Sequence, residues 1–112
     1  MNIEKLFYID DLDNKKISYK RLFSDLSGIS EISVLCKKNS IYEYFLYISA
    51  SLISQTPIVL LDSDLSESEI KELCGNGGFL QKNNVTIPEI KSFEEFLSLV
   101  KAGASSWTCT LF

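Results

Sequence analysis

The sequence predicts an α/β fold, with an open and mostly parallel sheet covered by helices on both faces. Short apolar runs typical of buried strands alternate along the chain with amphipathic segments typical of helices. The expected helices are roughly ten to fifteen residues long, which suits the crossover connections between parallel strands. A length of 112 residues is enough for one domain and too short for two.

The composition is that of an ordinary soluble domain, with 46% hydrophobic and 23% charged residues. An aromatic content of 12% excludes a disordered tail, and a formal net charge of −4 argues against a nucleic-acid-binding surface. The chain has no histidine, which excludes histidine metal sites, Ser-His-Asp and Cys-His nucleophiles, and histidine general bases. From the residues we assign no catalytic, cofactor-binding or metal-binding side chain.

The three cysteines, Cys36, Cys74 and Cys109, are widely spaced and form no C-x-x-C motif. An odd number of distant cysteines without histidine does not suit a disulfide framework or a zinc site. Each lies in or beside an apolar run, so we expect small buried hydrophobes in a reducing, cytoplasmic protein. The sequence shows no signal-peptide pattern and no apolar run long enough to span a membrane.

A strand is expected over residues 5–9, followed by a turn over 11–15 and a brief returning strand at 16–17. Ser18 then suits the N-cap of a helix that ends near Ser27, where a glycine follows. The helix would bury one apolar face, made of Leu22, Phe23 and Leu26.

Residues 31–36 predict one buried strand, and Asn39 can cap a long helix over 40–54. The helix is apolar over most of its circumference, and Glu43 is its one charged residue. The expected buried stripe consists of Ile41, Phe45, Ile48 and Leu52. Such a helix is normally covered on more than one side, so we expect the isolated chain to self-associate, most simply as a two-fold dimer.

The apolar run 58–61 after Pro57 is typical of a parallel strand buried on both faces. Ser66 with Glu69 is a capping box that predicts the start of the next helix, and Gly75 its stop.

The last helix has the same start signal in Ser92 and Glu95, with Gly103 as the expected stop. Residues 85–87 predict a short strand before it, and a final strand is expected from Trp107 onward.

Acidic residues follow two of the predicted strands, at Asp10-Asp11 and at Asp62 and Asp64. If the two strands were neighbours, these carboxylates could form a Mg²⁺ site that resembles the phospho-acceptor pocket of bacterial receiver domains. The lysine of that family has no counterpart in the last predicted strand. We therefore favour a structural role for Asp62 and Asp64 in a turn and helix start.

Two other groups of residues invite a functional interpretation. The glycine cluster over 75–78 follows a helix, so it suits a C-cap and turn better than a phosphate-binding loop, which precedes a helix. The tyrosines at 42, 44 and 47 could form a recognition surface, although core filling with hydroxyls at the surface is their more ordinary role.

Several segments together resemble a known family. Residues 17–26 carry Ser18, Tyr19 and Leu22 at the places of an (I/V)-(S/T)-Y-x-x-L segment, and 32–52 and 56–73 provide the strands, helices and acidic turn that follow it. In this order they resemble the N-terminal region of the adenylate-forming superfamily, which includes acyl-CoA synthetases, nonribosomal-peptide adenylation domains and firefly luciferase. Departures stand at Ser54 and Leu60, where the family commonly has glycine and proline, and they indicate a divergent subfamily.

The resemblance implies a parent enzyme that uses ATP and Mg²⁺ to convert a carboxylic acid into an acyl-adenylate. The final segment SSWTCTLF is similar to the strand that leads into the family's phosphate loop, which would begin after Phe112. Residues 1–112 are then expected to be an N-terminal structural portion of that enzyme, and their partner is the remainder of the enzyme. On its own this portion is expected to be inactive and to bind no ATP. The alternative is a self-contained receiver-like or protein-interaction α/β module with Asp62 near a strand end.

Overall fold

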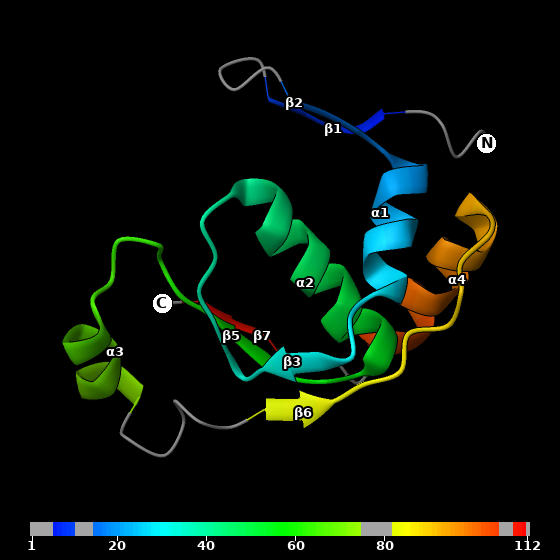
Figure 1. The fold of residues 1–112 in the computed structure, drawn as a ribbon. Helices are drawn as coiled ribbons and strands as arrows, with labels where there is room; N and C mark the ends of the chain where they lie inside the picture. The colour runs from blue at the N-terminus through cyan, green and yellow to red at the C-terminus, as the bar shows by residue number, and fades with distance from the viewer. Residues whose placement is uncertain (1–5, 11–14, 75–81, 106–108, 112) are drawn as a thin grey trace.

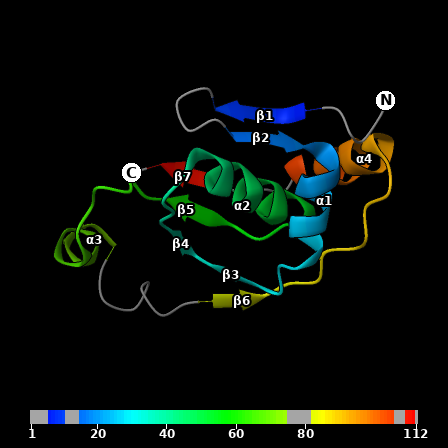
Figure 2. The same ribbon diagram turned by 45° about the horizontal axis from the view of Figure 1, so that its top comes forward.

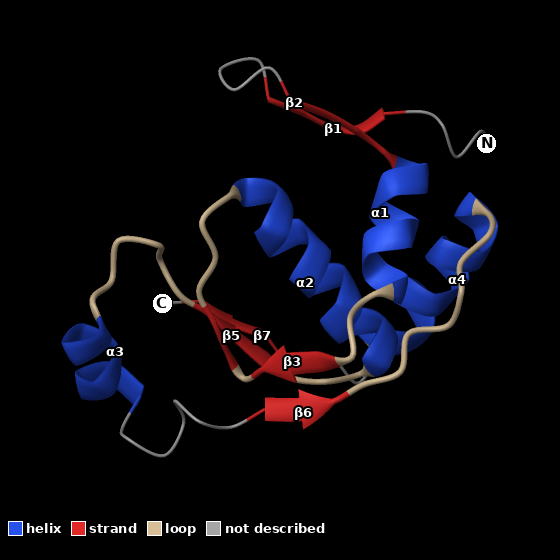
Figure 3. Cartoon of the chain, in the orientation of Figure 1, coloured by secondary structure: helices blue, strands red, loops and turns tan. Residues whose placement is uncertain are grey.

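Strands and helices alternate along the chain, which confirms the α/β class (Figures 1 and 3). The computed structural model describes residues 6–10, 15–74, 82–105 and 109–111. The strands are β1 (Leu6–Asp10), β2 (Lys15–Ser18), β3 (Glu31–Ser33), β4 (Leu35–Cys36), β5 (Ile58–Leu60), β6 (Lys82–Asn84) and β7 (Cys109–Leu111). The helices are α1 (Tyr19–Ser27), α2 (Ile41–Ser54), α3 (Glu67–Cys74) and α4 (Phe93–Ala104).

The described strands form three separate sheets rather than one. β1 and β2 form an antiparallel hairpin, β3 and β6 form a second antiparallel pair, and β4, β5 and β7 form a parallel sheet in the order β4-β5-β7. Parallel pairing is thus confined to three short strands. Figure 2 shows α2 between this sheet and the hairpin, so one helix joins two layers.

The run 31–36 makes two strands instead of the single one expected. Its first half pairs antiparallel with β6, and its second half pairs parallel with β5, with Cys36 opposite Leu60. The change occurs at Val34, whose carbonyl oxygen accepts a hydrogen bond from the Val59 N–H at 2.7 Å. One continuous apolar run therefore links an antiparallel ladder to the parallel sheet.

Helix α1 begins and ends where the sequence predicts. The Ser18 hydroxyl accepts a hydrogen bond from the Arg21 N–H at 3.2 Å, and Gly28 is the C-cap. The backbone of Gly28 is right-handed, with φ −85°, so this position does not require glycine for its conformation. The three predicted apolar residues of α1, Leu22, Phe23 and Leu26, are all buried.

Helix α2 starts one residue later than expected, because its N-cap is Ser40 and not Asn39. The Ser40 hydroxyl accepts a hydrogen bond from the Glu43 N–H at 3.2 Å. The helix ends at Ser54, and the C-cap residue Gln55 closes the last turn with a left-handed backbone, φ 56°.

The buried face of α2 is also rotated from the expected stripe. Ile41 is 60% exposed and Phe45 44% exposed, whereas the buried apolar residues are Tyr42, Leu46, Ala50 and Ile53. A helix that is apolar nearly all round does not fix its own orientation, so the neighbouring elements decide it.

Both predicted capping boxes start a helix. The Ser66 hydroxyl accepts from the Glu69 N–H at 3.2 Å, and the Glu69 carboxylate accepts from the Ser66 N–H at 3.4 Å. At α4 the Ser92 hydroxyl accepts from the Glu95 N–H at 3.2 Å, but the Glu95 carboxylate accepts from the Lys91 N–H instead of completing the box.

Gly103 does not stop α4, because the helix continues through it to Ala104. Gly103 is buried where α4 crosses α2, and a Cβ atom at this position would lie 1.7 Å from the carbonyl oxygen of Leu52. The glycine therefore permits close approach of two helices rather than marking a helix end.

The strand expected over 85–87 lies earlier, at β6. Strand β6 has only polar side chains and pairs with β3 through its backbone. After it, the Val85 N–H donates to the Ser30 carbonyl and Ile87 packs into the core.

Aromatic contacts hold α4 against α1. The rings of Tyr19 and Phe93 meet edge to face, with their centroids 5.2 Å apart, and the rings of Phe23 and Phe96 are also in contact.

The side chain of Cys36 is buried, as expected for a small hydrophobe. Other predictions fall outside the described residues or side chains: most of the turn over 11–15, the Gly75 stop, the cluster over 75–78, Trp107, and the side chains of Cys74 and Cys109. Within the described part of the chain, no helix has the length and apolar character needed to cross a membrane.

Candidate functional site

The carboxyl edge of the β4-β5-β7 sheet is a candidate site, because ligands of open α/β sheets bind at the carboxyl ends of the strands. Lys37 follows β4 and the acidic turn Asp62–Asp64 follows β5, so parallel pairing places both at the same edge. The Lys37 ammonium donates a hydrogen bond to the Leu65 carbonyl at 2.6 Å. This bond joins the ends of the two strands.

The carboxylate of Asp62 serves the turn itself. It accepts a hydrogen bond from the Asp64 N–H at 2.9 Å, and the Asp62 carbonyl accepts from the Leu65 N–H at 3.1 Å. The Tyr44 hydroxyl on α2 donates to the carbonyl of Leu61, just before the turn. The bond from the Asp64 N–H to the Asp62 carboxylate is that of an Asx turn, and it supports a structural role for the acidic residues.

The receiver-like arrangement is not formed in the described structure. That site would need Asp10 and Asp62 at neighbouring strands of one parallel sheet, but β1 pairs with β2 in a separate antiparallel hairpin. Among the residues that the structure describes, no three His, Cys, Asp or Glu side chains are grouped so as to hold a metal ion. Strand pairing therefore places Asp10 in a different sheet from β5, the strand that precedes Asp62.

A cleft of about 560 Å³ opens between β2, α1 and the start of α2. Its lining residues are Lys16, Ile17, Arg21, Asp25, Ser40, Tyr42, Glu43 and Leu46. The buried Tyr42 hydroxyl donates to the Asp25 carboxylate at 2.6 Å, and the Arg21 guanidinium lies 3.5 Å from the same oxygen.

Burial, reinforced by the Asp25 carboxylate, raises the pKa of Tyr42 well above its ordinary value. The phenol thus stays protonated and ties α2 to α1. Much of the charge in this cleft is satisfied internally, since Arg21 faces Asp25 and the Ser40 hydroxyl contacts Glu43. The cleft is therefore better equipped to hold three elements together than to do chemistry.

The other two predicted tyrosines are also engaged in the fold rather than free for recognition. Tyr44 binds the Leu61 carbonyl, and the ring of Tyr47 lies under the Lys38 ammonium, 4.0 Å from its centroid. The second contact belongs to a group that the sequence did not reveal. Lys82 lies far along the chain from the adjacent pair Lys37 and Lys38, yet all three line one cleft in the fold.

Comparison with known proteins gives no relative: no family model, no curated protein and no solved structure matches this chain. The residue pattern and the geometry of the carboxyl edge are the features that bear on function. That edge carries a lysine, an acidic turn and the end of β7.

Proposed function

We propose that residues 1–112 form the N-terminal structural portion of a cytoplasmic adenylate-forming ligase, which activates a carboxylic acid with ATP to an acyl-adenylate. One observation carries the proposal: β7 runs parallel to β5, with Leu111 opposite Leu60. A segment that follows β7 would emerge at the carboxyl edge, beside Lys37 and the Asp62 turn. In the family that this sequence resembles, a Ser/Thr/Gly-rich phosphate loop follows the corresponding strand.

Adenylate chemistry requires amides and hydroxyls around the phosphates, with Mg²⁺ and a lysine to offset the charge that develops. The described residues contain no group of side chains suited to a metal ion. In this proposal ATP and Mg²⁺ are held by later segments of the parent enzyme. This chain supplies the scaffold: a parallel edge from which the loop would depart and a helix that supports it.

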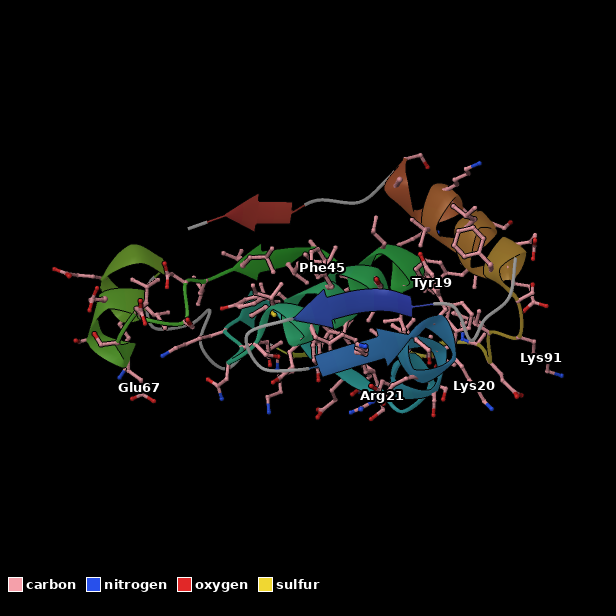
Figure 4. The ribbon with its side chains drawn as sticks, turned by 90° about the horizontal axis from the view of Figure 1, so that it is seen from above. Tyr19, Lys20, Arg21, Phe45, Glu67 and Lys91 are labelled. Atoms are coloured by element: carbon pink, nitrogen blue, oxygen red, sulfur yellow. The ribbon has the colours of Figure 1, made fainter. Side chains whose placement is uncertain are left out.

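The remainder of the parent enzyme is the proposed partner. β7 stands at the end of the strand order β4-β5-β7, so further strands could extend the parallel sheet beyond it. Ile41 and Phe45 expose apolar surface on α2, which later segments would cover (Figure 4 labels Phe45). The same two residues also fit the second candidate function, a self-contained protein-interaction module.

The coding sequence beyond Phe112 separates the two candidates. The ligase proposal expects a loop similar to TSGTTG-x-P-K within about twenty codons, a window chosen to include the whole motif with its helix start. The extended protein should then catalyse ATP–pyrophosphate exchange with at least one acid from a carboxylic acid panel. The 112-residue chain, as the matched control, should not. A stop codon at this point, or an extended protein without exchange activity, would favour the interaction module.

A further inference from the structure

We propose that the cleft between the β3–β6 ladder, the end of β4 and helix α2 binds a small phosphate-bearing anion. The cleft has a volume of about 300 Å³ and is called the lysine cleft below. Its lining residues are Glu31, Ser33, Cys36, Lys37, Lys38, Tyr47 and Lys82. The inference does not depend on the ligase proposal: the two share Lys37, but the anion site also rests on Ser33, Lys38 and Lys82, which the ligase proposal does not use.

Two of the three ammonium groups are positioned by the protein itself. The Lys37 ammonium donates to the Leu65 carbonyl at 2.6 Å, and the Lys38 ammonium lies 4.0 Å from the centroid of the Tyr47 ring. Long lysine side chains normally lose rotamer freedom when they bind a ligand. Since these two are already held, less entropy is lost when an anion arrives.

The third ammonium group comes from the β3–β6 ladder. Lys82 stands directly opposite Ser33 in the antiparallel register, and directly opposed residues project from the same face of a ladder. Ser33 can therefore offer a hydroxyl donor beside the Lys82 ammonium. Glu31, two residues before Ser33, lies on the same face and is the one acidic residue among the described residues that line the cleft.

The charge balance of the lysine cleft selects an anion. Three lysines and one glutamate stand among the described residues that line the cleft, in a chain whose net charge is −4. Within the described part of the chain, no carboxylate lies within 4.0 Å of the ammonium of Lys38 or Lys82. The positive charge of these two lysines is thus available to a ligand.

The same balance favours a phosphate dianion over a carboxylate. A doubly charged oxyanion with several acceptor oxygens can use the lysines and the Ser33 hydroxyl together, which a singly charged carboxylate cannot do as fully. The cleft volume is at the low end for ligand sites, so it suits a phosphate group with a small substituent. Buried Cys36 adds an apolar wall at the end of β4.

Titration of inorganic phosphate into the 112-residue chain, followed by amide NMR at constant ionic strength, tests the proposal. We expect saturable shifts at Ser33, Lys38 and Tyr47, with a Kd of about 1 mM or lower. Lys38→Gln and Lys82→Gln should each raise this Kd about fivefold or more, because each removes one ammonium group. Acetate should bind at least about tenfold more weakly than phosphate.

Lys91→Gln is the matched control, since it removes the same charge from an exposed side chain outside the cleft. Figure 4 shows Lys91 at the end of the molecule opposite α3. Far-ultraviolet circular dichroism should show all three variants folded, because each replaces a lysine that is not fully buried. The proposal is overturned by non-saturable shifts, by acetate binding as tight as phosphate, or by equal weakening in Lys91→Gln.

Discussion

Replacing Gly103 by alanine is expected to destabilise the fold, although alanine is the better helix former. Gly103 lies within α4, at the crossing with α2. A Cβ atom there would stand 1.7 Å from the carbonyl oxygen of Leu52 and 2.7 Å from its carbonyl carbon. Real Cβ atoms essentially never approach another atom closer than 3.0 Å, so one helix must move.

The magnitude follows from two opposing contributions. Overpacking a close contact costs about 1–3 kcal/mol, and the upper end applies because the obstructing atoms are helix backbone and cannot rotate away. The higher helix propensity of alanine returns about 1 kcal/mol. The free energy of unfolding should therefore fall by about 2 kcal/mol, which corresponds to roughly 8 °C in Tm for a domain of this size.

Urea denaturation followed by circular dichroism measures this loss, with Gly28→Ala as the matched control. A Cβ at Gly28 would meet its nearest atom, the Asp25 carbonyl oxygen, at 3.5 Å, an ordinary contact. The backbone there is right-handed, so alanine fits without strain. Gly28→Ala should change stability by no more than about 0.5 kcal/mol. If Gly103→Ala is as stable as the unmutated chain or more stable, the gain in helix propensity outweighs any clash with Leu52, and the proposed close approach of α4 to α2 is wrong.

Three further predictions concern α2 and the acidic turn. Tyr42→Phe should lower the free energy of unfolding by about 1–2 kcal/mol at neutral pH, measured by urea denaturation, because it removes the partly buried hydrogen bond to the Asp25 carboxylate. The pKa of Tyr42 is raised in the folded state, so its contribution to the free energy of unfolding is present below pH about 10 and is lost above that pH, where the phenol of the unfolded chain ionises. The free energy of unfolding of Tyr42→Phe should therefore decline less at alkaline pH than that of the unmutated chain. Asp62→Asn should keep the fold and lower the free energy of unfolding by no more than about 1–2 kcal/mol. After incubation of the unmutated chain with acetyl phosphate and Mg²⁺, intact-mass measurement should show no phosphate adduct. An adduct that disappears in Asp62→Asn would refute the structural role. Light scattering at about 100 µM should show that the chain self-associates, and Phe45→Ser should weaken this association. A clean monomer of the unmutated chain would contradict the prediction.

Local chemistry made parts of this fold predictable from the sequence. Ser18, Ser66 and Ser92 cap the helices that follow them, because an N-cap bond joins residues two or three positions apart. The α/β class follows from the same local patterns, and so does the turn role of Asp62, whose carboxylate reaches the N–H two residues on.

The candidate sites depended on contacts between distant residues. Nothing in the run 31–36 indicates that its halves pair with different strands, since strand partners are chosen across long stretches of chain. The separation of Asp10 from Asp62 follows from the same choice. The sequence order likewise hides the lysine cleft, because Lys82 reaches Lys37 and Lys38 through strand pairing.

The sequence by itself determined the starts of α1, α3 and α4, the α/β class and the charge of this protein, since the starts and the class depend on neighbours within one or two turns of chain. Tertiary structure decided the rest. It chose which side of the nearly all-apolar α2 is buried, where Ile41 and Phe45 remain exposed. It also turned Gly103 from an expected helix stop into a close contact between α2 and α4. The physical reason is that an amphipathic pattern fixes a face only when polar residues mark the other one, and a glycine's role depends on what lies against it.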